Sequence, residues 1–62
     1  MQFNVPTLDS PKAAKELKET ILTSEPNAKV EIDLDSKMVT INSEASEETF
    51  KELIVATGHK MD

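Results

Sequence analysis

Two segments that alternate between apolar and polar side chains, separated by a short break, constrain the fold of this chain most. Alternation with a period of two is typical of a β-strand with one buried face. The inward positions are Val30, Ile32 and Leu34 in the first segment and Val39 and Ile41 in the second. Residues 35–37 make a short turn between them, which predicts an antiparallel hairpin. One apolar and one polar face also predict a sheet that is covered on one side only.

A helix is predicted before the hairpin. Ser10 followed by Pro11 is typical of an N-cap and a first helical position. We expect the Ser10 hydroxyl to accept a hydrogen bond from the amide of Lys12 or Ala13. Apolar residues then recur at helical spacing, at Ala14, Leu17 and Ile21. Pro26 disfavours helical geometry in the residue before it, so the helix is predicted to end near residues 23–24.

A second helix is predicted after the hairpin. Ser46 is its expected N-cap, and Glu47 and Glu48 would lie favourably at the positive end of the helix dipole. The apolar stripe consists of Phe50, Leu53, Ile54 and Thr57. Gly58, the only glycine in the chain, stands where a left-handed residue commonly ends a helix.

A short strand is expected at each end of the chain, around Phe3 and Val5 and in residues 59–62. The order is then strand, helix, strand, strand, helix, strand. Right-handed crossovers put both helices on the same face of the sheet. The sequence therefore predicts an α+β, ferredoxin-like sandwich with a four-stranded antiparallel sheet, formed by residues 1–62 as a single domain.

Composition excludes several classes of protein. The chain has 12 acidic residues, 7 lysines, no arginine and no cysteine, with a net charge of −5. Residues 1–24 are neutral overall, so residues 25–62 hold the entire acidic excess. A nucleic-acid reader would need a basic face, and a disulfide-stapled miniprotein would need cysteines. No apolar run is long enough to span a bilayer and no signal peptide is evident, so we expect a cytoplasmic monomer.

The sequence does not predict an enzyme. It has one histidine, no cysteine and no glycine-rich loop, and nearly all of its carboxylates lie on predicted outward faces. Asp33 and Asp35 are spaced like the start of a calcium loop. No glycine follows at the sharp-turn position, however, and the segment is a strand that enters a hairpin.

Three stretches resemble a known family. "VPTLDSPKAAKEL", "VEIDLDSKMVTI" and the closing "GH" are similar to heavy-metal-associated domains, and most similar to the small cyanobacterial copper chaperones. The resemblance extends from Val5 to His59. The fold that it implies is the ferredoxin-like sandwich predicted above, and the metal that it implies is copper.

The family's function depends on a loop motif, M-x-C-x-x-C, at the start of the first helix. Its two thiolates hold one Cu(I) ion, a soft cation that prefers soft ligands. The motif's methionine corresponds to Leu8 here, and its two cysteines correspond to Ser10 and Ala13. Leu8 can still act as an apolar plug, but a serine hydroxyl is a hard, weak donor and alanine is not a ligand. We therefore expect little or no tight Cu(I) binding.

His59 provides an alternative metal hypothesis. In the family, the histidine of the "GH" loop lies near the metal. With Asp9 and Ser10 it could form a weak hard-donor site for Zn²⁺, Ni²⁺ or Cu²⁺, although metal sites usually need three or four donors. A lone histidine after a helix end is also common as a plain surface residue.

Two further hypotheses concern protein partners. The family docks through the start of its first helix, often onto the N-terminal metal-binding domain of a metal-transporting P-type ATPase. Lys12, Lys15 and Lys18 are the docking residues that this implies, although a solvated helix face with lysine–glutamate pairs would have the same pattern. A module that binds a basic partner through Glu31, Asp33 and Asp35 is the remaining alternative.

Overall fold

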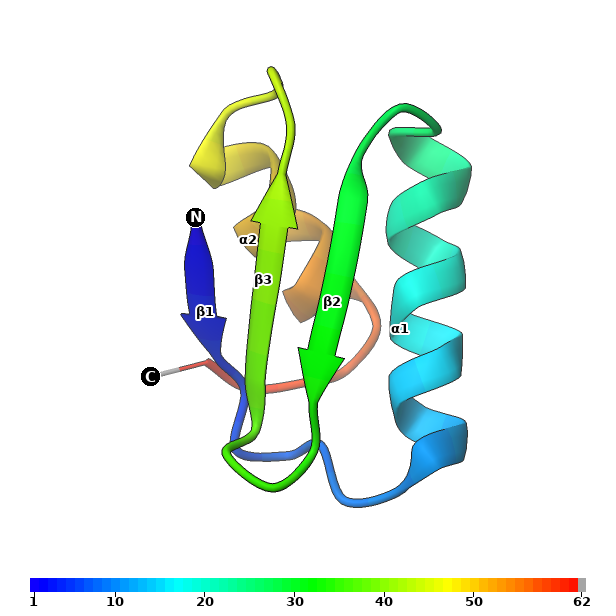
Figure 1. The fold of residues 1–62 in the computed structure, drawn as a ribbon, viewed down its shortest axis with the longest axis vertical. Coiled ribbons are helices and arrows are strands. Elements are labelled where there is room, and N and C mark those ends of the chain that lie inside the picture. Colours follow the sequence, from blue (N-terminus) through cyan, green and yellow to red (C-terminus); the bar gives the residue numbers. More distant parts are fainter. Residues whose placement is uncertain (62) are drawn as a thin grey trace.

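The computed structural model describes residues 1–61, in which two helices cover one face of an antiparallel sheet (Figure 1). The elements are β1 (Gln2–Asn4), α1 (Pro11–Ser24), β2 (Lys29–Asp33), β3 (Met38–Asn42) and α2 (Glu47–Ala56). The strand order is β1-β3-β2, so the connection through α1 crosses over β3. The hairpin and both predicted helices are confirmed.

Register places the apolar side chains of the three strands on one face. Val39 in β3 lies opposite both Phe3 in β1 and Ile32 in β2, and Val30 lies opposite Ile41. Successive side chains of a strand point to opposite faces, so the same register exposes the polar positions on the other face. The predicted alternation is thereby confirmed.

The core lies between this apolar face and the helices. It consists of Phe3, Val5, Leu8, Leu17, Ile21, Ala28, Val30, Val39, Ile41, Phe50 and Ile54. No polar or charged side chain is buried among the described residues. Burial of apolar surface against the sheet is therefore what holds both helices in place.

Local signals set the ends of the helices as expected. The Ser10 hydroxyl accepts a hydrogen bond from Ala13 N at 3.1 Å, and the Ser46 hydroxyl accepts one from Thr49 N at 3.3 Å. α1 ends at Ser24. Gly58 has a φ of +91°, the left-handed conformation that favours glycine at this position.

The fourth strand is not confirmed. Residues 59–61 form no β-ladder, and Asp62, the last residue of the expected strand, lies outside the described residues. The Lys60 amide donates a hydrogen bond to the Thr7 hydroxyl at 3.1 Å. Because this amide is bound to a side chain, it does not pair with a strand backbone. The sheet therefore has three strands in the described part of the chain.

Candidate functional site

The segment between β1 and α1, residues 5–10, is held against the β2–β3 turn. The Val5 amide donates to the Lys37 carbonyl at 2.8 Å, and the Leu8 amide donates to the Val5 carbonyl at 3.0 Å. The Lys37 ammonium donates to the Leu8 carbonyl at 2.6 Å. Leu8 itself is fully buried, as its expected role as a plug requires. Contacts within the protein therefore tie this segment to the β2–β3 turn.

The two positions that correspond to the family's cysteines serve to begin a helix. The Ser10 hydroxyl caps α1, and the Ser10 carbonyl accepts the first helical hydrogen bond, from Ala14 N at 3.1 Å. Ala13 is half-buried and packs against the core. One position is thus committed to a cap and the other presents only a methyl group.

His59 lies beside the same segment but bonds to a residue that the sequence analysis did not identify. Its Nδ1 is hydrogen-bonded to the Thr7 hydroxyl at 2.8 Å. Asp9 and Ser10 are the other residues of the hypothetical hard-donor site, and Asp9 is exposed. The described residues contain no group of three or more histidine, cysteine, aspartate or glutamate side chains that could hold a metal ion.

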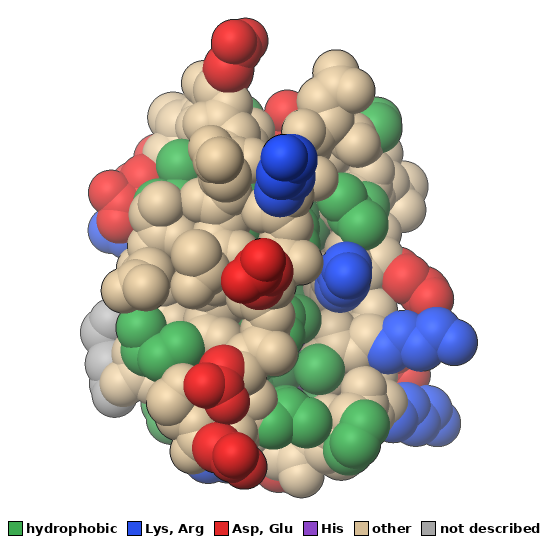
Figure 2. All heavy atoms as spheres, viewed as in Figure 1, with side chains coloured by type: hydrophobic (Ala, Val, Ile, Leu, Met, Phe, Trp, Pro, Cys, Tyr) green, Lys and Arg blue, Asp and Glu red, His purple; other side chains and the backbone are tan. Residues whose placement is uncertain are grey.

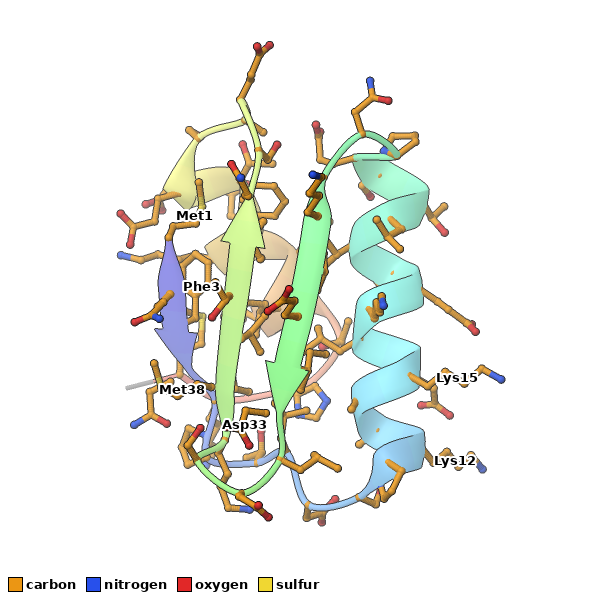
Figure 3. The ribbon with its side chains drawn as sticks, in the orientation of Figure 1. Met1, Phe3, Lys12, Lys15, Asp33 and Met38 are labelled. Carbon is orange, nitrogen blue, oxygen red and sulfur yellow. The ribbon has the colours of Figure 1, made fainter. Side chains whose placement is uncertain are left out.

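The lysines of α1 are exposed. Figure 3 shows Lys12 and Lys15 projecting from α1 away from the sheet. Lys15 and Lys18 also border a shallow groove between α1 and β2, where Val30 and Glu31 form the opposite wall. The three side chains are therefore available to a partner.

The acidic residues of the hairpin lie on the open face of the sheet. Acidic side chains run down this face over β2 and the following turn (Figure 2). Glu31 and Asp33 are exposed there, and Asp33 Oδ1 accepts a hydrogen bond from the Asp35 amide at 3.0 Å. This face is separate from the segment that begins α1.

Comparison with known proteins identifies the family. A copper-bound, trimeric form of the copper chaperone Atx1 from Synechocystis PCC6803 is 31% identical, with a TM-score of 0.95 over 100% of this chain and 98% of that one. A structure described as "Crosstalk between Cu(I) and Zn(II) homeostasis" is 34% identical over the same shares of both chains, also with a TM-score of 0.95. The chain belongs to the Atx1-type copper-chaperone family. A cyanobacterial copper metallochaperone solved in solution is 33% identical, with a TM-score of 0.81 over 100% of this chain and 97% of that one. No family profile and no curated protein sequence matches the chain.

This Atx1-type chain lacks thiolate donors. Thiolates are soft ligands that suit Cu(I), and the chain has no cysteine. Ser10 and Ala13, which the resemblance aligns with the family's two cysteines, are a helix cap and an alanine packed on the core. The donor set therefore does not fit tight thiolate binding of Cu(I). No helix among the described residues is both long and apolar enough to cross a bilayer.

Thr7 and Lys37 are the residues of this region that sequence reasoning missed. Thr7 contacts His59 across 52 positions of sequence, and Lys37 contacts Leu8 across 29. Periodicity and capping patterns report only on neighbours within a few residues. A positive φ of 57° at Lys37 shows that its turn is unusual, but no glycine or asparagine stands there to indicate it.

Proposed function

We propose that this chain is a copper-chaperone-like docking domain with little or no tight Cu(I) binding of its own. The observation that carries the proposal is the use of Ser10 and Ala13 to begin α1, at the two positions that the resemblance aligns with the family's cysteines. A hydrogen bond from Lys37 to the Leu8 carbonyl also ties the loop to the β2–β3 turn. A non-enzymatic role in the cytoplasm agrees with what the family implies.

The partner that we propose is the N-terminal metal-binding domain of a metal-transporting P-type ATPase. The resemblance implies this class of partner, and the exposed Lys12, Lys15 and Lys18 supply positive charge for an acidic surface on it. Residues 25–62 carry the whole excess of negative charge, so positive charge is concentrated on α1. We infer that these three lysines, the lysine row, set the orientation in which an acidic partner docks.

Two alternatives have less support. A hard-donor metal carrier would use His59 and Asp9, but two protein donors leave most of a coordination shell to water. An acidic module would use Glu31, Asp33 and Asp35, which face solvent on the open sheet. Charge on an exposed face is the ordinary state of a surface and by itself indicates no partner.

Restoring the two thiols tests the proposed correspondence between this loop and the family's metal loop. We expect Ser10→Cys with Ala13→Cys to bind one Cu(I) per chain under anaerobic, reducing conditions, because both sulfurs then lie at the start of α1. The measurement is competition with a chromophoric Cu(I) chelator, after a fold check by circular dichroism.

The matched control is Ser24→Cys with Ser36→Cys. It adds two exposed thiols at opposite ends of the molecule, one at the end of α1 and one in the β2–β3 turn (Figure 1). This variant should withdraw far less Cu(I) at the same protein concentration. Equal withdrawal by both variants, or none by a folded Ser10/Ala13 variant, would refute the correspondence.

A further inference from the structure

The Thr7 hydroxyl joins two segments that are far apart in the sequence. It is hydrogen-bonded to His59 Nδ1 at 2.8 Å, and it accepts a hydrogen bond from the Lys60 amide at 3.1 Å. Thr7 precedes α1, whereas the other two residues follow α2. The hydroxyl therefore fixes the place where the chain after α2 meets the segment that begins α1.

Counting donors and acceptors leaves two arrangements of hydrogens in this contact. A threonine hydroxyl has one hydrogen and two lone pairs, and the Lys60 amide occupies one lone pair. If Nδ1–H donated to the second lone pair, the hydroxyl hydrogen would be left to solvent. Donation of the hydroxyl hydrogen to His59 Nδ1 satisfies both groups within the protein, and this is the arrangement that we infer. In that arrangement the neutral ring carries its own proton on Nε2.

The other side of the His59 ring is not enclosed. The ring is half-buried and borders a shallow depression between α1 and α2, with Glu16 and Leu17 on the α1 side. The hydroxyls of Thr20 and Thr57 also border the depression, but each donates to a backbone carbonyl of its own helix. With those two hydroxyl hydrogens used, the imidazole is the side chain in the lining of this depression that can still donate to a ligand, whereas the Glu16 carboxylate accepts.

We propose that Thr7 is a positioning residue for His59, which holds Nδ1 and so presents Nε2–H as a hydrogen-bond donor to an oxygen acceptor on the docking partner. The role of the partner rests on the proposed docking function, but the orientation of the ring does not. In this tautomer Nε2 carries a proton and has no lone pair for a cation, so a metal carrier would require the other tautomer, with Nδ1–H donating to Thr7.

The ring nitrogens can be observed directly in the isolated protein. His59 is the only histidine, so its two ring ¹⁵N resonances belong to one residue, and their couplings to the two ring carbon-bound protons distinguish Nδ1 from Nε2. At a pH where the ring is neutral, we expect the wild type and Thr7→Ser to hold the proton on Nε2 almost exclusively, beyond the excess of that tautomer in a short peptide. Thr7→Val keeps the shape of the side chain but removes the hydroxyl, and should move the tautomer ratio toward that of a histidine in a short peptide.

Two results would overturn the positioning role. One is a wild-type ring with its proton mainly on Nδ1, and the other is a tautomer ratio that Thr7→Val leaves unchanged. Amide spectra of the strands provide the fold check, because Thr7 is exposed and lies outside the core. A merely structural role for Thr7 would change the stability of the protein without selecting a tautomer.

A double-mutant cycle tests the donor role. The binding partner is the N-terminal metal-binding domain of the copper-transporting P-type ATPase from the same organism. Loss of one hydrogen bond should weaken association about fivefold in His59→Ala and no more than that in Thr7→Val. The double variant should bind as His59→Ala does, since Thr7 acts through the ring. Additive losses, or no loss in His59→Ala, would contradict the donor role.

The two experiments fail in different ways. If the wild type does not associate with the partner domain at all, both the proposed docking function and the donor role are wrong. The ring ¹⁵N measurement still decides whether Thr7 positions His59, because it uses the isolated chain.

Discussion

Ser10 shows how a single side chain decides the use of a loop. A serine at this position accepts a hydrogen bond from the Ala13 amide and so satisfies a backbone group that the start of a helix leaves open. A cysteine at the same place could hold a soft metal ion, but a thiol is a weak hydrogen-bond acceptor. The residue present here therefore favours a stable helix start over metal binding.

Ser10→Ala tests how much the N-cap of α1 contributes to stability. We expect it to lower the free energy of unfolding by about 1 kcal/mol, the usual cost of removing an N-cap side chain. Chemical denaturation followed by circular dichroism measures the change. Ser36→Ala, at an exposed position in the β2–β3 turn, is the matched control and should change stability by less than about 0.5 kcal/mol. An equal decrease in the free energy of unfolding of the two variants would show that the Ser10 cap stabilises the protein no more than an ordinary surface side chain does.

The elements of this fold differ in how far their sequence determines them. Strand alternation, the caps at Ser10 and Ser46, and the position of Gly58 are local patterns, and the structure confirms all of them. The contacts of Thr7 and Lys37 link distant segments, so no local pattern could indicate them. The described residues after α2 likewise form a long-range contact, from the Lys60 amide to the Thr7 hydroxyl, where a fourth strand was expected.

The end of α2 supplies a prediction at the element scale. Gly58 has a φ of +91°, and open space surrounds the position where a Cβ would lie. Gly58→Ala should therefore destabilise the protein through backbone strain alone, by about 1–2 kcal/mol. Gly58→Asn should cost less, since asparagine tolerates left-handed geometry better. Thermal or denaturant unfolding would reveal the order, and an alanine variant as stable as the wild type would contradict it.

At the scale of the whole molecule, charge is distributed unevenly over the surface. The open sheet face carries Glu31 and Asp33, whereas Lys12 and Lys15 project from α1 away from the sheet and Lys18 is exposed beside the groove between α1 and β2. Complementary charge mainly sets the rate and orientation of encounter between proteins. If the chain docks as proposed, we expect docking to depend on such features, because it has no cysteine to share a metal ion with its partner.

Reversing the charge of the three α1 lysines tests whether they form a docking site. Lys12→Glu, Lys15→Glu and Lys18→Glu together should weaken binding to the N-terminal domain of a copper-transporting P-type ATPase at least tenfold, with the largest loss at low salt. The matched control reverses Lys29 and Lys51, which lie outside the proposed docking region, and is compared with the double reversal of Lys12 and Lys15 so that the net charge changes equally. Equal losses in these two double variants, measured by titration at two salt concentrations, would indicate an effect of net charge rather than a docking site.

Titration with Cu(I) measures directly whether this Atx1-type chain binds the metal tightly. The wild-type protein is titrated into a Cu(I) complex of a chromophoric chelator, anaerobically and with a reductant present. We expect the absorbance of the complex to stay unchanged up to several equivalents of protein, because no thiolate is available. Withdrawal of one Cu(I) per chain from the chelator would contradict this expectation.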